Sequence, residues 1–135
     1  MSRFTIAFGA LVVAQAAHSV EEYVGRLWEN FPPAAFLTGL LSSNGERGFI
    51  ILNVAIVAFG LWCLIWPVRL GWRSANALAW GWVVIETING VGHPAWTILR
   101  GRYTPGVGTA PLLLVLALYL ASRLRHPQPR TMSAA

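Results

Sequence analysis

The stretch FTIAFGALVVAQAAHSVEEYV, residues 4–24, decides how this chain is organised. It is apolar for most of its length, and its charged side chains gather near the end in HSVEE, residues 18–22. Residues three and four apart share one face of a helix, so His18, Glu21 and Glu22 would lie within an arc of roughly 100°. The stretch therefore predicts an apolar helix whose charged side chains point in one direction.

A second polar arc lies in ETINGVGH, residues 86–93, inside another long apolar segment. Steps of three, four and seven keep Glu86, Asn89 and His93 within roughly 60° of one another on a helix. Neither arc is expected to face lipid, because charged groups inside a membrane face a protein interior or a water-filled cavity. We therefore expect the two arcs to meet in one site.

The composition is that of a membrane protein. Hydrophobic residues make up 56% of the 135 residues and charged residues only 11%, against about 25% charged in ordinary soluble domains. The five acidic residues are all glutamate and the ten basic residues are all arginine, which gives a net charge of +5. The arginines lie in short clusters between apolar segments, a pattern typical of contact with lipid head groups. It argues against nucleic acid as a partner, which would favour a basic stripe on a soluble fold.

Four apolar segments predict an all-α, four-transmembrane-helix bundle, with spans at residues 4–24, 49–68, 75–99 and 107–122. Residues 1–125 would form this single domain with a long first loop, and residues 126–135 a disordered polar tail. Six arginines fall on the side of the two termini and four on the other side, so both termini are expected to be cytoplasmic. The alternative for the first segment is a cleaved signal peptide ending at Ala14-Gln15-Ala16.

Proline and glycine mark the predicted interruptions of the helices. Pro32-Pro33 are expected to end any helix and impose extended backbone, and Pro105-Gly106 match a type II turn. Gly90, Gly92 and Pro94 interrupt the third span, so we expect it to kink or unwind near His93.

Ionisable side chains inside apolar helices are costly, so their presence here indicates a functional site. Each ionised side chain at a helix centre costs roughly 2.5 to 3.5 kcal/mol, so three free glutamates would cost about 8 to 10 kcal/mol. Imidazoles and carboxylates together suit iron, manganese or zinc. The predicted metal ligands are His18, Glu21, Glu22, Glu86 and His93; the three glutamates are also candidate catalytic groups, and Asn53 and Asn89 are candidate supporting hydrogen-bond donors.

These residues carry a family resemblance. The motifs are HxxEE at residues 18–22, Glu86-x-x-Asn89-x-x-x-His93, and Arg102-Tyr103-x-Pro105-Gly106 before the last apolar segment. Over about residues 8–120 the chain resembles the HXXEE family of small membrane proteins, whose function is uncharacterised. The resemblance implies that the polar positions belong to one shared site, and it supplies no substrate or reaction.

Three kinds of function fit this pattern. The first is a metal-dependent membrane enzyme that acts on a lipophilic small molecule with metal-activated water or oxygen. The second is a metal-free acid-base catalyst, such as an isomerase, a cyclase or an epoxide-opening enzyme, in which a glutamic acid protonates the substrate and Trp82 or Trp96 stabilises a cation. The third is a small proton-coupled or metal transporter, for which a homo-oligomer is expected because four spans are few for alternating access.

Overall fold

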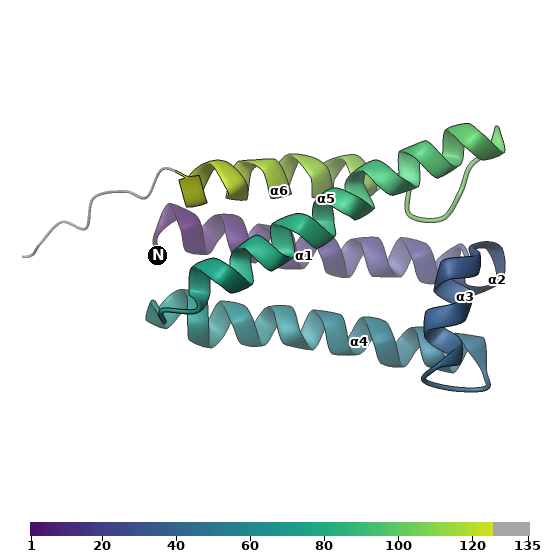
Figure 1. Cartoon of the computed structure of the whole chain (residues 1–135), viewed down its shortest axis with the longest axis horizontal. Coiled ribbons are helices and arrows are strands. Elements are labelled where there is room, and N and C mark those ends of the chain that lie inside the picture. Colours follow the sequence, from purple (N-terminus) through teal and green to yellow (C-terminus); the bar gives the residue numbers. More distant parts are fainter. Residues whose placement is uncertain (126–135) are drawn as a thin grey trace, which may run out of the picture.

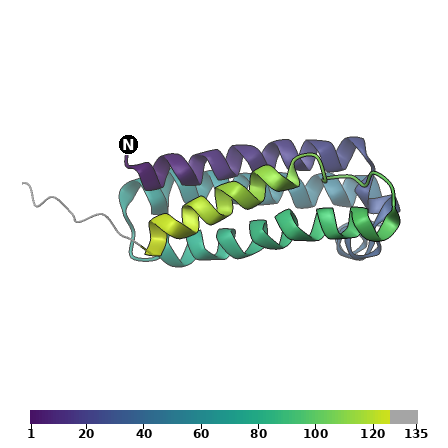
Figure 2. The same cartoon turned by 90° about the horizontal axis from the view of Figure 1, so that it is seen from above.

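The structure is a computed structural model that describes residues 1–125, and these residues are helical with short connections. The elements are α1 (Arg3–Val24), α2 (Leu27–Asn30), α3 (Pro32–Gly39), α4 (Gly45–Cys63), a π-helical continuation η1 (Leu64–Val68), α5 (Ala75–Arg100) and α6 (Ala110–Arg125). The long helices α1, α4, α5 and α6 lie side by side, and α2 and α3 lie across one end (Figures 1 and 2). The predicted all-α class is confirmed for this part of the chain. The predicted tail, residues 126–135, lies outside the described residues.

Two apolar clusters hold the bundle together, one on each side of the HSVEE stretch. The larger one joins α1, α5 and α6 near the N-terminal end, where Phe8, Leu11, Leu113 and Leu120 are fully buried. The smaller one lies at the α2–α3 end and consists of Leu27, Trp28 and Phe49 with Phe31, Ala34 and Trp96 packed against it. Residues 18–22 lie between the two clusters along α1, and the side chains of His18, Ser19 and Glu22 are buried there.

The outer surfaces of the long helices are apolar. Val13 on α1, Val54 on α4, Ile88 on α5 and Val115 on α6 each expose more than half of their surface. Two helices are long and apolar enough to cross a membrane by length and composition, Arg3–Val24 and Gly45–Val68. The other two spans of the four-span bundle stay a prediction.

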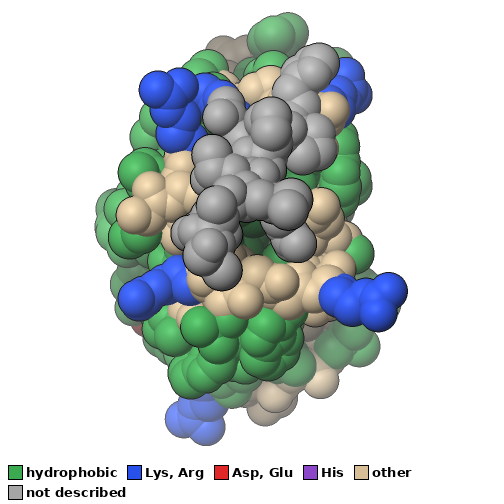
Figure 3. Space-filling view, turned by 90° about the vertical axis from the view of Figure 1, so that its left-hand side faces the viewer, with side chains coloured by type: hydrophobic (Ala, Val, Ile, Leu, Met, Phe, Trp, Pro, Cys, Tyr) green, Lys and Arg blue, Asp and Glu red, His purple; other side chains and the backbone are tan. Residues whose placement is uncertain are grey.

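Basic side chains lie at both ends of the bundle, and five of the nine arginines within residues 1–125 lie at the end that carries the N-terminus. Arg3 begins α1, Arg69 follows η1 and Arg125 ends α6, so these three lie at the same end of the bundle. The view onto this end shows blue basic side chains spaced around its rim, with green apolar side chains between and below them (Figure 3).

Local chemistry explains the helix starts and corrects the prediction for the paired prolines. Ser2 and Asn44 accept hydrogen bonds from backbone N–H groups of the first turns of α1 and α4, which is what an N-cap supplies. The prediction for the paired prolines is confirmed before them, since α2 ends at Asn30 and Phe31 is extended. It is wrong for the prolines themselves: Pro32 begins α3, because proline at the first helical position loses no hydrogen bond.

The helix α5 runs unbroken from Ala75 to Arg100 with Pro94 inside it, so the predicted unwinding near His93 is wrong. Gly90 packs against α6. A Cβ placed on it would lie 2.6 Å from the Cβ of Leu114 and 2.9 Å from its backbone N. Small residues let helices approach this closely, so this glycine serves helix packing and does not interrupt the helix.

Candidate metal centre

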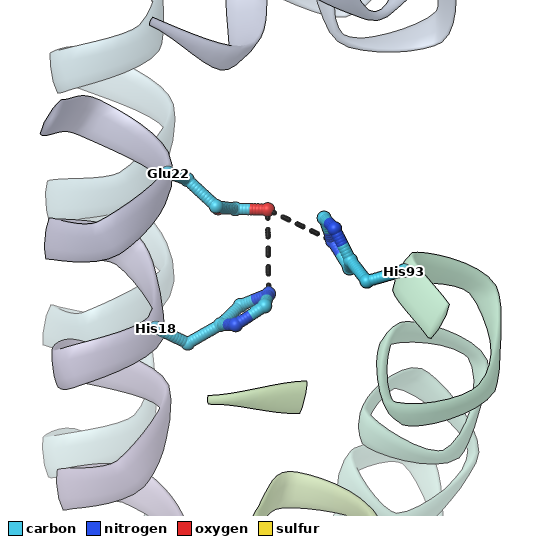
Figure 4. A group of neighbouring side chains, drawn as sticks. All are labelled: His18, Glu22 and His93. Atoms are coloured by element: carbon cyan, nitrogen blue, oxygen red, sulfur yellow. Dashed lines mark ion pairs between the residues drawn. The ribbon is translucent and has the colours of Figure 1, made fainter. Parts of the chain in front are cut away.

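Three buried side chains from two helices converge on one point. Glu22 lies one turn after His18 on α1, and His93 projects from α5 toward both of them (Figure 4). The Oε1 atom of Glu22 is 3.3 Å from Nε2 of His18 and 3.1 Å from Nε2 of His93. The two imidazole rings meet edge to face with centroids 4.7 Å apart. The prediction that the two polar arcs share one site is confirmed for these residues.

The partners of the two Nδ1 atoms determine which ring nitrogens carry the protons. Nδ1 of His93 is 2.7 Å from the carbonyl oxygen of Pro105, which can only accept, so His93 donates through Nδ1. Nδ1 of His18 is 2.7 Å from the hydroxyl oxygen of Thr109, whose single proton goes to Oε2 of Glu21 at 2.6 Å. His18 therefore also donates through Nδ1. In their neutral forms both rings carry a lone pair on Nε2, which is the atom that faces Glu22.

Three electron-pair donors that face one another must be joined by protons or by a metal ion. No residue in the range 1–125 makes a hydrogen bond of acceptable geometry to Nε2 of His18, although this nitrogen is fully buried. The donor atoms of His18, Glu22 and His93 all lie within 4.8 Å of one another. Two imidazole nitrogens and one carboxylate oxygen form a ligand set that both zinc and non-haem iron sites use.

Glu21 lies outside the three-residue centre, and its predicted roles as a ligand and a catalytic group stay predictions. Its carboxylate accepts hydrogen bonds from the Tyr103 hydroxyl, the Gly108 N–H, the Thr109 N–H and the Thr109 hydroxyl at 2.6 to 2.8 Å. The bond to the Glu21 carboxylate raises the pKa of the exposed Tyr103 hydroxyl to about 12. Glu21 therefore joins the end of α1 to the connection between α5 and α6.

Glu86 is fully buried but lies outside the three-residue centre. Asn89 donates a hydrogen bond to its Oε2 at 3.3 Å. When the Gln15 amide is oriented with its nitrogen toward Glu86, it donates to both carboxylate oxygens at 3.1 and 2.9 Å. The structure thus pairs Glu86 with two amides, and its predicted roles as ligand and catalytic group stay predictions.

The two predicted supporting amides differ in position. Asn53 joins α1 to α4: its Oδ1 accepts from the Ser19 hydroxyl at 2.6 Å, and its Nδ2 donates to the Phe49 carbonyl at 3.1 Å. Asn89 lies nearer the centre, because it lines a cavity of about 110 Å³ together with His93. The remaining walls of this cavity are mostly apolar and come from Phe31, Ile88, Gly92 and Trp96.

The sequence prediction missed Thr109 and Gln15, which contact His18 and Glu86 in the structure. Gln15 lies three residues before His18, so helical spacing would have placed it on the same face. Thr109 precedes an apolar segment, where a hydroxyl residue is typical of a helix start, but its contact with His18 spans 91 residues. The turn at Pro105-Gly106 is confirmed: Gly106 has φ +92°, and the Val107 N–H donates to the Thr104 carbonyl at 3.3 Å.

Comparison with known proteins identifies a family and no activity. A family model described as "Protein of unknown function with HXXEE motif" matches residues 10–120, a range that contains all three residues of the centre. The searches of curated proteins and of solved structures found no match.

Proposed function

The chain belongs to the family of proteins of unknown function with an HXXEE motif, and we propose that it is an integral membrane enzyme whose catalytic metal ion is held by His18, Glu22 and His93. One observation carries the proposal. Both histidines donate their Nδ1 protons away from the centre, so two Nε2 lone pairs and one carboxylate oxygen face a common point.

The separations support a single metal ion. Ligand atoms about 2.0 to 2.2 Å from a zinc ion in tetrahedral or similar geometry lie roughly 3 to 3.5 Å from one another. The Oε1 atom of Glu22 is 3.1 and 3.3 Å from the two Nε2 atoms, which agrees with this range. The three ligand atoms together span up to 4.8 Å, so the two Nε2 atoms would move closer together around one ion. Three protein ligands leave coordination positions for water or substrate, as catalytic zinc and non-haem iron sites do. Zinc and iron(II) are accordingly the favoured ions, with manganese as the third.

The surroundings favour a lipophilic substrate. The cavity beside His93 has apolar walls from Phe31, Ile88 and Trp96 and one amide, that of Asn89. A cavity of this kind would hold an apolar group and leave few polar contacts for orienting it. The bound ion would supply activated water or oxygen. His18, Glu22 and His93 would hold the ion, and the apolar walls would exclude bulk water from it.

The membrane setting proposed here uses all four long helices. Their outward side chains are apolar, including Val115 on α6 and Ile88 on α5. The 26 residues of α5 extend roughly 39 Å at 1.5 Å per residue, which exceeds the roughly 30 Å hydrocarbon core and suits a tilted span. Both termini are proposed to be cytoplasmic, because six arginines fall on the side of the two termini and four on the other side.

A metal-free acid-base catalyst is the second candidate, and the same contacts support it. Protons on the two Nε2 atoms would make both imidazolium rings ion-pair partners of the Glu22 carboxylate, whose Oε1 lies 3.3 and 3.1 Å from them. Glu86, paired only with amides among the described residues, would then be the group that carries a proton to the substrate. The two candidates differ in whether an ion is bound.

Elemental analysis of protein purified in mild detergent without chelator separates them. The metal proposal predicts about one zinc, iron or manganese ion per chain, and a rise in Tm when that ion is restored to chelator-treated protein. Glu22→Gln should lose the ion. The matched control is Glu46→Gln, because Glu46 is a glutamate that accepts from the Tyr23 hydroxyl and lies outside the centre. Wild-type protein with no stoichiometric ion and no metal-dependent stabilisation would overturn the metal proposal and favour the acid-base candidate.

A further inference from the structure

Both histidines of the metal centre depend on one connection, residues 101–109 between α5 and α6. The Nδ1 atom of His93 donates to the Pro105 carbonyl, and that of His18 donates to the Thr109 hydroxyl. A metal-binding histidine is held in one tautomer and one orientation by the partner of its other nitrogen. The connection 101–109 therefore supplies this partner for each ring.

The connection also packs directly on the two rings. A Cβ placed on Gly106 would lie 2.6 Å from Cε1 and Nδ1 of His93 and 2.9 Å from Cε1 of His18. On the other side, a Cβ on Gly25 would lie 2.5 Å from Cγ of Pro105. The backbone of this connection is thus confined between the end of α1 and the two imidazoles, and a shift in it would move both rings.

Glu21 holds this connection in place. Its Oε1 accepts from the Tyr103 hydroxyl at 2.6 Å and from the Gly108 N–H at 2.8 Å. Its Oε2 accepts from the N–H and the hydroxyl of Thr109 at 2.8 and 2.6 Å. The two N–H donors immediately precede α6, where a negative charge interacts favourably with the helix dipole.

The same four bonds exclude Glu21 from the ligand set in this arrangement. A carboxylate offers about four lone-pair sites, and Glu21 uses all of them on Tyr103, Gly108 and Thr109. Glu22, by contrast, directs Oε1 to the two Nε2 atoms. The adjacent glutamates of the HxxEE motif therefore have different roles.

We propose that Glu21 is a positioning residue: through the connection 101–109 it holds His18 and His93 in the Nδ1–H tautomer and presents both Nε2 lone pairs to the metal ion. The proposal rests on the metal centre proposed above. The hydroxyl of Thr109 is the direct link, because it accepts from His18 and donates to Glu21.

Metal titration distinguishes positioning from ligation. Titrating chelator-treated protein with zinc should show Glu21→Gln binding one ion per chain roughly 10- to 100-fold more weakly than wild type, the effect typical of a residue that supports a ligand. Glu22→Gln should lose stoichiometric binding, and Glu46→Gln should bind like wild type. A Glu21→Gln protein that binds as tightly as wild type, or that loses stoichiometric binding as Glu22→Gln does, would overturn the proposal.

A second readout does not require the ion. In metal-free, ¹⁵N-histidine-labelled protein at a pH where the imidazoles are neutral, ¹⁵N spectra report which nitrogen carries the proton. A His126→Gln background leaves His18 and His93 as the two labelled residues. We expect the Nδ1–H form for both in wild type, and loss of that form for both in Glu21→Gln. Unchanged tautomers would contradict the proposal.

Two further variants keep the test decisive if Glu21→Gln does not fold. Thr109→Val removes the partner of His18 and one of the four hydrogen bonds to Glu21, and it keeps the Pro105 carbonyl that binds His93. It should therefore change the tautomer of His18 and leave that of His93. Thr109→Ser keeps the hydroxyl and should restore both the tautomer and the zinc affinity. If Thr109→Val and Thr109→Ser had the same His18 tautomer and the same zinc affinity, the Thr109 hydroxyl would not be the link between Glu21 and His18. If wild type binds no metal, the proposed function fails, but the tautomers still decide whether Glu21 positions the rings.

Discussion

Replacing Gly106 with alanine should damage the centre through one methyl group. The new Cβ would lie 2.6 Å from two ring atoms of His93 and 2.9 Å from Cε1 of His18, so both rings or the backbone must move. Overpacking of this kind typically costs about 1 to 3 kcal/mol. Gly106 also has φ +92°, a region in which an L side chain costs roughly a further 1 to 2 kcal/mol. The two costs together give about 2 to 5 kcal/mol.

Gly101→Ala is a matched control for the backbone part of this cost. Gly101 lies in the same connection with φ +62°, but a Cβ placed on it would meet nothing within 4 Å. It should lose only the roughly 1 to 2 kcal/mol of backbone strain. Because 1 kcal/mol corresponds to roughly 4 °C in a domain of this size, we expect Tm to fall by about 4 to 8 °C in Gly101→Ala and by about 8 to 20 °C in Gly106→Ala.

The assay is thermal unfolding in detergent, followed with and without zinc. Zinc should still raise the Tm of Gly101→Ala, because its rings are undisturbed, and should raise that of Gly106→Ala less or not at all. Equal losses of Tm in the two variants, together with equal responses to zinc, would refute the close approach of Gly106 to the imidazoles.

Two further predictions concern contacts outside the metal centre. The Glu21 carboxylate raises the pKa of Tyr103 to about 12, so Glu21→Gln should lower that pKa toward the ordinary value of about 10. Ultraviolet titration, with Tyr103→Phe as the reference, measures this pKa. An unchanged pKa would contradict the hydrogen bond between Tyr103 and Glu21. Ser19→Ala removes the hydrogen-bond donor to Asn53 and should lower the free energy of unfolding by about 1 kcal/mol. The zinc content should stay unchanged, because this contact lies between α1 and α4. A loss of bound zinc would show that the two faces of α1 are coupled.

Helical periodicity was sufficient to predict that His18 and His93 share a site, because it placed the charged side chains of each helix on one face. It could not separate Glu21 from Glu22. The two lie three and four residues after His18, and both positions fall on the same face as the histidine. The choice depends on the connection 101–109, whose N–H groups and hydroxyls bind Glu21. Those contacts join segments far apart in the sequence and leave no periodic signal.

The wrong predictions also depend on tertiary contacts. Gly90, Gly92 and Pro94 were expected to kink or unwind their helix on intrinsic preference alone, whereas α5 does not unwind and Gly90 serves its close packing on Leu114. Pro32-Pro33 were interpreted as a helix end, which is right for α2, since it ends at Asn30 before the extended Phe31, but proline is also typical of a helix start. Which of these applies depends on the residues that follow, and the small apolar residues after Pro33 continue the helix.

X-ray absorption spectroscopy at the edge of the bound metal tests the central claim most directly. We predict one ion per chain with two imidazole nitrogens and one carboxylate oxygen among its ligands in wild type, and with one imidazole in His93→Ala. Protein that binds no ion, or an ion whose imidazole ligands do not change when His93 is removed, would contradict a centre formed by His18, Glu22 and His93.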